Sequence, residues 1–493
     1  METAQTTFPP AGELPNDSGA MEYWGVDELP APPPFNFRNI IAVIGPGAIM
    51  AATSIGGGEW LVGPAAAVKY SSSIFLIATV AILLQVIFNL EAIRYTLYTG
   101  EPIYGGIMRL KPGSRFWAVY YSVIGFFQLG WPALAGSAAA ALLSAFIGRM
   151  PGMPDRELQI ILTIGILLLV VFILSFGGTI ERMLEKFAWI MLALVFTFLI
   201  AVNVAFVPAA HWWDTFKGFF QMTGLPRPID WGLIGALAAT AGSGGLGNLT
   251  VTNWIRDKGF GMGAKVGAIP SAIAGHEIRL SHVGKIFAVN ESSLARWREW
   301  MRYVTVDQIW VWGLFCFVGM FLNVNLATHI VPHGTDLQGL GAGAYQAEYL
   351  RKLWPALWFL TLFNGFWILF KTQLGNTDIL VRTVTDALWM SSRRVRAWKG
   401  GRIQWVYYSI LGAFTIWAFL AISFASPMTL FKILANVAGL VLAIAGIQIF
   451  WVNRRFLPSA LRPPLWRELL LLTCSAFYAF FSFFVFRNLL QQL

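Results

Sequence analysis

Residues 45–60 read Gly-Pro-Gly-Ala-Ile-Met-Ala-Ala-Thr-Ser-Ile-Gly-Gly-Gly-Glu-Trp and lie inside a long apolar stretch, residues 39–69. The three consecutive glycines at 56–58 disfavour a continuous helix, since each costs about 1 kcal/mol relative to alanine. Glu59 follows them at about mid-membrane depth. Hydrocarbon tolerates an interrupted backbone or a charge only where these face protein or a water-filled cavity. We therefore expect the functional site at this interruption.

The composition indicates an integral membrane protein. The chain has 493 residues, of which 57% are hydrophobic and 12% are charged, and its mean hydropathy is +0.62. Soluble domains carry about 25% charged residues. Cys316 and Cys474, the two cysteines, lie within apolar stretches, so a disulfide framework is not expected. The sequence carries no metalloprotease, serine-hydrolase or phosphate-loop motif. We expect neither an enzyme, nor a catalytic residue, nor a cofactor.

Eleven apolar stretches are long enough to span a bilayer, which takes about 20 residues in a helix. They are residues 39–69, 73–93, 116–147, 157–176, 187–208, 231–255, 307–331, 353–380, 404–424, 428–452 and 465–487. Most of the 35 lysines and arginines lie in alternate connections. We expect the protein in the cell (inner) membrane. This charge pattern places its N-terminus in the cytoplasm and its C-terminus on the extracytoplasmic side. It also explains the net charge of +10 without a nucleic-acid partner.

The spans divide the chain into three parts. Residues 1–37 are acidic, rich in proline and without a basic residue, which predicts a disordered cytoplasmic tail. Residues 38–456 form a ten-span core. Within it, residues 257–302 make a basic cytoplasmic loop, whose last part we expect to be an amphipathic helix on the inner leaflet. Residues 457–493 hold the eleventh span.

The sixth span repeats the peculiarity of the first. Residues 241–250 read Ala-Gly-Ser-Gly-Gly-Leu-Gly-Asn-Leu-Thr, and this density of glycine again disfavours a continuous helix. The two interruptions are five spans apart, so the two halves of the core have opposite orientations in the membrane. Interrupted spans at corresponding positions of two inverted halves indicate the binding site of a secondary transporter. The alternative is close helix packing, for which small residues also serve.

At this point the sequence resembles the Nramp divalent-metal transporters, a branch of the LeuT-like fold. The resemblance rests on four motifs and on their order and spacing over residues 39–456. The motifs are Gly45-Pro46-Gly47, Tyr98-Thr99-Gly100-Glu101, Glu181-Arg182-Met183-Leu184-Glu185 and Asn453-Arg454-Arg455. It implies an all-α, LeuT-like 5+5 inverted repeat with discontinuous first and sixth spans, plus an eleventh span. It also implies a metal ion symporter.

The sequence departs from this family at the metal site. The family's first-span signature Asp-Pro-Gly-Asn is replaced by Gly56-Gly57-Gly58-Glu59. Its sixth-span signature Met-Pro-His-Asn is replaced by Gly245-Leu246-Gly247-Asn248. The family's metal-binding Asp and Met are thus both glycine here. The acidic proton relay of the family's third span falls near Gln128, and this span contains no acid.

The remaining polar groups define a candidate site. If a metal is bound at all, Glu59 and Asn248 offer hard oxygen ligands. Glu59 is also the candidate proton carrier, although it could instead pair with a base and only hold helices together. Trp60 could stack on an organic or cationic solute. The candidate substrate-binding residues are Gly56, Gly57, Gly58, Glu59, Trp60, Gly242, Ser243, Gly244, Gly245, Leu246, Gly247, Asn248, Asn364 and Asn436.

Three functions therefore remain open. The first is a secondary active transporter that moves a small cation, a divalent metal by resemblance, with alternating access around the two interruptions. The second is a transporter of a small organic solute such as an amino acid or amine, since two glycine replacements enlarge the cavity. The third is a membrane sensor that binds a ligand without moving it. The expected partners are the solute or cation and the lipid bilayer, and we take a monomer as the working expectation.

Overall fold

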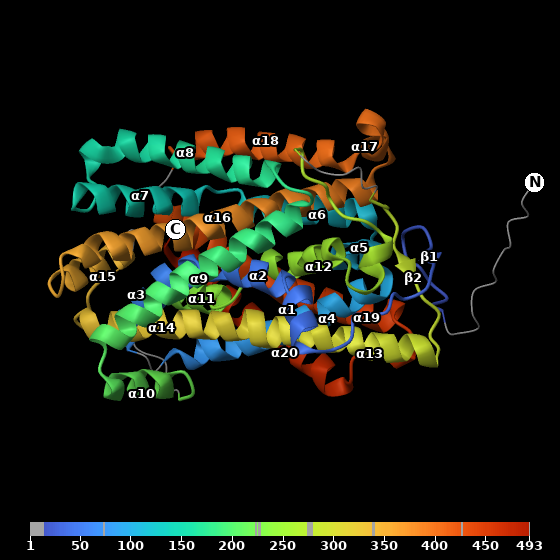
Figure 1. The fold of residues 1–493 in the computed structure, drawn as a ribbon, viewed down its shortest axis with the longest axis horizontal. Coiled ribbons are helices and arrows are strands. Elements are labelled where there is room, and N and C mark those ends of the chain that lie inside the picture. The colour runs from blue at the N-terminus through green and yellow to red at the C-terminus, as the bar shows by residue number, and fades with distance from the viewer. Residues whose placement is uncertain are drawn as a thin grey trace, which may run out of the picture.

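The computed structural model describes residues 14–71, 74–221, 224, 228–273, 280–337, 341–424 and 427–492. Nearly all regular structure in these residues is helical (Figure 1). The two short strands β1 (Gly25–Val26) and β2 (Lys285–Ile286) pair in parallel. The prediction of an all-α polytopic membrane protein is confirmed.

The helices follow the predicted spans closely. They are α1 (Phe37–Val43), α2 (Pro46–Ser54), α3 (Gly63–Tyr70), α4 (Leu76–Thr99), α5 (Ile103–Arg109), α6 (Ser114–Leu129), α7 (Ala133–Ile147), α8 (Arg156–Ser175), α9 (Ile180–Phe206), α10 (Ala209–Gly218), α11 (Trp231–Thr240), α12 (Leu246–Lys258), α13 (Glu291–Thr305), α14 (Leu314–Ile330), α15 (Gly341–Arg351), α16 (Ala356–Ser391), α17 (Arg393–Ala397), α18 (Ile403–Ala421), α19 (Pro427–Phe456) and α20 (Leu465–Gln492).

Helices lie at all eleven predicted stretches, but not all of them are typical spans. Among the described residues, eight helices are long and apolar enough to cross a membrane. Residues 37–70 make a ninth span if their two parts, bent by 58°, are counted together. The two remaining stretches are the interrupted pair α11–α12 and α16, which carries Lys371, Asp378 and Arg382 within its length. The departures from a simple apolar span thus concentrate in the core of the bundle.

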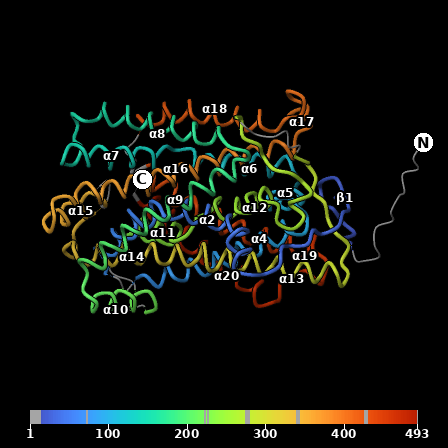
Figure 2. The backbone as a smooth tube through the Cα atoms, viewed as in Figure 1, coloured from blue at the N-terminus to red at the C-terminus, as the bar shows by residue number. Residues whose placement is uncertain are grey.

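The interrupted segments lie at the centre of the molecule. Figures 1 and 2 show α2, α11 and α12 in the middle of the bundle, with α8 and α18 along one edge. Every residue of α2 is buried. By contrast, α8 exposes Leu168 and Phe172, and α18 exposes Ile416, as expected of helices that face lipid. The charged and polar residues of the centre are therefore shielded from the hydrocarbon by other helices.

The N-terminal segment differs from the prediction. Residues 1–13 of the predicted disordered tail lie outside the described residues. For residues 14–36, which we call the N-terminal strap, the prediction is wrong. The strap adds β1 to β2, and it buries Trp24 with its ring 4.0 Å from the guanidinium carbon of Arg109. Composition could not indicate this, because the apolar and hydrogen-bonding partners come from segments that are distant in sequence.

The predicted amphipathic helix also differs. Residues 291–330 form one continuous helical segment of 40 residues, in which α13 leads directly into the span. Trp297 packs against Phe287 and Trp300 against Phe260, with ring centroids 6.1 and 5.2 Å apart. The tryptophan face of this helix therefore packs on protein, and its position at the inner leaflet stays a prediction.

Candidate functional site

The first interruption lies between α2 and α3. The chain leaves the helix at Ile55, where ψ is 83°, and re-enters it through a π-helical turn at Gly58–Val62. One carboxylate oxygen of Glu59 accepts a hydrogen bond of 2.9 Å from the Gly56 N–H. The carboxylate therefore satisfies a backbone donor that the broken helix leaves without a partner.

The second interruption lies between α11 and α12. Gly244 and Gly245 have φ values of +69° and +62°, a left-handed conformation that favours glycine. The side chain of Gln85, on α4, accepts from the Ser243 N–H at 3.1 Å. Gln128, on α6, donates to the Gly244 carbonyl at 3.1 Å and accepts from the Leu246 N–H at 3.2 Å. Two buried carboxamides thus replace the hydrogen bonds that the helix gives up.

The two interruptions meet. A Cβ atom on Gly58 would collide with the carbonyl oxygen of Thr240, so this close contact requires glycine. Beside the contact lies a small cavity of about 30 Å³, to which Thr372, Asn376 and Phe431 also contribute. Its volume is sufficient for a water molecule or a bare ion.

Many of the predicted substrate-binding residues gather here. Those that line the cavity are Gly57, Gly58, Gly242, Ser243 and Gly244. Those beside them, at the ends of the interruptions, are Gly56, Glu59, Gly245, Leu246 and Gly247. The second carboxylate oxygen of Glu59 is buried and has no hydrogen-bond partner among the described residues. That these residues bind a substrate stays a prediction.

The other four predicted residues make their contacts elsewhere. The indole of Trp60 packs against the backbone at Gly343 and Gly365 and faces a separate gap of about 20 Å³. Asn248 donates to Asn89 at 2.9 Å. The remaining two are Asn364 and Asn436, each of which has one polar atom without a partner in the described part of the chain.

Sequence reasoning missed several residues of the site. The sequence analysis does not name Gln85 or Phe431. It names Gln128 only as the position near which the family has an acidic residue. Lys371 is a base with which Glu59 could have paired. No ion pair or hydrogen bond joins these two residues within the described chain. Instead, the Lys371 ammonium donates to backbone carbonyl groups of the first span. An isolated Gln or Lys in an apolar span was the available signal.

A buried chain of hydrogen bonds connects the start of α2 with α12. The Asp307 carboxylate accepts from the Gly47 N–H at 2.8 Å and from the Gln308 side chain at 2.8 Å. Asn89 then donates to Gln308 at 3.0 Å, and Asn248 donates to Asn89. The polar face of α12 is therefore held by side chains from α4 and from the segment between α13 and α14.

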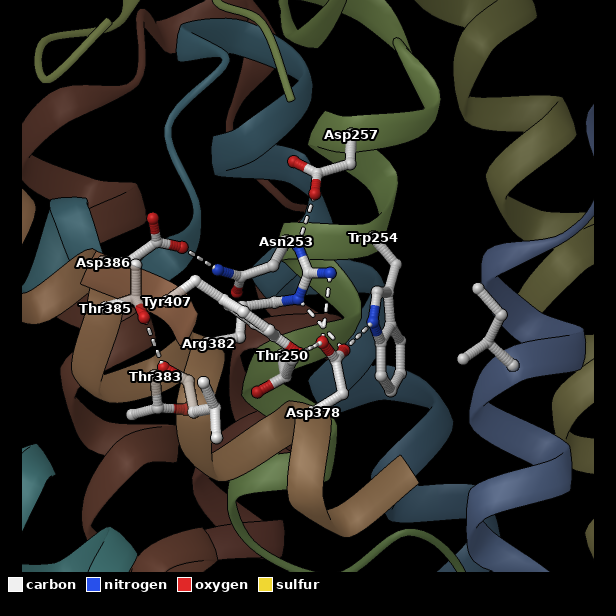
Figure 3. Close-up of polar contacts among 12 residues, drawn as sticks. Thr250, Asn253, Trp254, Asp257, Asp378, Arg382, Thr383, Thr385, Asp386 and Tyr407 are labelled. Atoms are coloured by element: carbon white, nitrogen blue, oxygen red, sulfur yellow. Dashed lines mark hydrogen bonds and ion pairs between the residues drawn. The ribbon is translucent and has the colours of Figure 1, made fainter. Parts of the chain in front are cut away.

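A second polar assembly, the ionic cluster, lies at the far end of α12 (Figure 3). It comprises Arg256, Asp257, Asp378, Arg382 and Asp386, whose side chains are all buried. Arg382 pairs with Asp257 and, at 3.0 Å, with Asp378. Trp254 and Tyr407 donate to Asp378 at 2.9 and 2.7 Å. The cluster ties α12 to α16 and α18 at a distance from the cavity lining.

The side chains that most often bind metals do not gather in the described part of the chain. Within the described residues, no group of three or more His, Cys, Asp and Glu side chains lies close enough to hold an ion. Glu59 and Asn248 each keep one oxygen that has no partner among the residues described. A divalent ion would have to complete its shell from backbone carbonyls, which are hard ligands.

Comparison with solved structures identifies the fold, whereas comparison of sequences finds no match. No family model and no curated protein matches the sequence. In three dimensions, the chain is similar to a mutant of the manganese transporter of Eremococcus coleocola, with a TM-score of 0.65 and 13% identity over 94% of this chain and 90% of that one.

The chain has the fold of these transporters. The same transporter in complex with an aromatic bis-isothiourea substituted compound gives a TM-score of 0.62 and 14% identity, over 95% of this chain and 90% of that one. The Nramp-like, LeuT-like fold that the motifs predicted is thereby confirmed.

Proposed function

We propose that this protein is a secondary active transporter that moves a small solute across the cell membrane by alternating access at its two helix interruptions. The meeting of Gly58 with Thr240 beside a central cavity supports the proposal. So does the fold, which it has in common with a manganese transporter. Carriers with discontinuous helices bind their substrates at such interruptions, near the middle of the membrane.

For the substrate we propose a small organic solute without net charge, such as a zwitterionic amino acid. The observation that carries this proposal is the buried ammonium of Lys371 on the carbonyls of Ala52 and Ile55. In its protonated form this group would repel a divalent cation, because water screens little there. An organic solute is larger than a 30 Å³ cavity, so the two interruptions must separate to admit it.

A divalent cation is the second candidate. One oxygen of Glu59 and one of Asn248 are buried without a partner among the described residues, and both are hard ligands. In this case Glu59 would also be the proton-coupling residue. Gln128 stands near the position of the acidic relay in the family's third span, which leaves Glu59 as the proposed proton carrier.

Binding and transport measured on the full chain separate these candidates. Calorimetric titration with Mn²⁺, Mg²⁺ and Cd²⁺ should give no saturable binding, whereas neutral amino acids should raise the thermal unfolding midpoint. A stabilising solute should then exchange by counterflow in proteoliposomes. Glu59→Gln should abolish this exchange, while Glu157→Gln, an exposed control on α8, should not.

Each alternative has its own signature. Saturable Mn²⁺ binding that Glu59→Gln removes would establish the cation. Solute binding without counterflow would establish a sensor and overturn transport. The proposed orientation, with the N-terminus in the cytoplasm, is tested by labelling single cysteines: Arg393→Cys should react only from inside and Met153→Cys only from outside.

A further inference from the structure

The carbonyl oxygens at the C-terminal end of α2 carry partial negative charge and lack intrahelical partners. The helix ends at Ser54, deep inside the protein. Lys371, on α16, donates from its Nζ to the Ala52 carbonyl at 2.8 Å and to the Ile55 carbonyl at 2.7 Å. Its side chain is buried, with 3% exposed. The amino group of Lys371 therefore lies on this helix end at the central interruption.

The position of the ammonium is fixed by close helix packing. A Cβ atom on Gly375 would collide with the Thr53 side chain, and one on Gly56 would collide with Thr372. These glycines let α16 approach α2 closely. The Thr372 hydroxyl lies 3.5 Å from the Ile55 carbonyl oxygen and adds a further oxygen beside the ammonium.

Hydrogen bonding to the carbonyl groups at the end of α2 does not by itself explain why a lysine is present at position 371. Burying an ammonium group costs far more than burying a hydroxyl. Within the same helix, Thr53 and Ser54 satisfy the carbonyls of Ile49 and Met50 with hydroxyl groups, at 2.9 and 2.7 Å. A neutral donor would therefore suffice for satisfaction of the carbonyl groups, whereas the lysine brings a positive charge.

We propose that the C-terminal end of α2 is a monovalent-cation site and that Lys371 fills it as a tethered cation. Unwound carbonyls at half-helix ends coordinate the free coupling ion in carriers with discontinuous helices. Lys371 supplies the same charge from the protein itself, so that no free Na⁺ is needed. This role in coupling rests on the proposed transport function, whereas the cation site itself does not.

The test is Na⁺ binding by the purified full chain, which does not depend on transport. Thermal unfolding is compared in NaCl and in choline chloride at equal ionic strength. The wild type should show the same midpoint in both salts. Lys371→Ala removes the charge and the side-chain volume, and it should gain a saturable, Na⁺-specific increase of several degrees.

Two matched variants separate charge from space. Lys371→Met removes the charge but keeps the volume, so it should show no Na⁺ effect; Lys371→Arg should behave as the wild type. If Lys371→Ala does not fold, Lys371→Ser carries the same expectation. A variant that stays monodisperse in NaCl and aggregates on exchange into choline chloride also supports the site.

Three results would contradict the cation site, the role of Lys371 or the transport function. Identical midpoints in both salts for folded Lys371→Ala and Lys371→Ser would overturn the site. A Na⁺-specific increase in the wild type would show that Lys371 does not fill it. Absence of counterflow in the wild type, together with the Na⁺ effect in Lys371→Ala, would refute the transport function alone.

Discussion

The carboxamide of Gln128 lies against Gly244, with its Nε2 donating to the Gly244 carbonyl oxygen at 3.1 Å. Its Oε1 accepts from the Leu246 N–H at 3.2 Å, so one side chain bridges the interruption of the sixth span. The loop between α11 and α12 thus depends on a residue of α6 for its shape.

Gln128→Leu should destabilise the protein and abolish solute binding. It leaves the Gly244 carbonyl and the Leu246 N–H buried without partners, and each such group costs about 1–3 kcal/mol. Thermal unfolding in detergent measures the effect, with Gln404→Leu, on the peripheral helix α18, as the control. Equal midpoints for Gln128→Leu and the wild type would show that the bridge contributes nothing.

Gly58→Ala should be harmful because the added methyl group meets the Thr240 carbonyl oxygen. Backbone cannot move aside as a flexible side chain can, and overpacking costs about 1–3 kcal/mol. Gly412→Ala, in α18, has open space around its Cβ and should be neutral or slightly stabilising. Unfolding midpoints and counterflow measured on both variants check this. Similar effects of the two substitutions would contradict the contact between the interruptions.

Arg382→Met should lower the free energy of unfolding by about 3–5 kcal/mol, because it removes the guanidinium that pairs with the buried carboxylates of both Asp378 and Asp257. Arg393→Met, at an exposed position, is the control. The double variant Arg382→Met, Asp378→Asn should recover part of the loss, since the two residues interact directly. Simple additivity in chemical unfolding experiments would exclude this coupling.

Asp27→Asn should loosen the N-terminal strap. Burial alone raises the pKa of Asp27, but hydrogen bonds from Lys285 and Lys265 outweigh it and lower the pKa from 3.8 to about 2. A carboxyl group with a lowered pKa stabilises the folded state above its unfolded pKa, and this stabilisation disappears as the pH falls through the folded pKa. The wild type should therefore lose protection of the strap between about pH 4 and pH 2.

Hydrogen exchange at residues 24–27 reports this loosening. At neutral pH, Asp27→Asn should exchange faster there than the wild type, and acid should change its exchange less. Glu28→Gln, the exposed neighbour, is the control. Wild-type exchange in Asp27→Asn would mean that the strap is held by Trp24 and Arg109 without help from this ion pair.

The sequence was sufficient for the spans and for the two interruptions. The length of an apolar stretch indicates whether it can span the membrane. Glycine-rich segments such as residues 56–58 and 242–247 indicate where a helix is interrupted. Both signals are local. The order of motifs along the chain was also enough to predict the fold, which the similarity to a solved transporter confirms.

The sequence did not indicate which way individual side chains point. Trp60 follows Glu59 directly, yet it packs on Gly343 and Gly365 outside the cavity. Residues 14–36 read as a disordered tail, yet they pack on segments that are distant in sequence. In both cases the partner lies far along the chain, so no local pattern could indicate it.

By itself, then, the sequence determined that this is a multi-pass helical protein with two broken helices and a nearby carboxylate. The tertiary structure decided which groups meet there: Gly58 with Thr240, Gln128 with Gly244, and Lys371 with the end of α2. The physical reason is that a broken helix must find donors and acceptors for its freed backbone groups. Which neighbouring helix supplies them depends on packing in three dimensions.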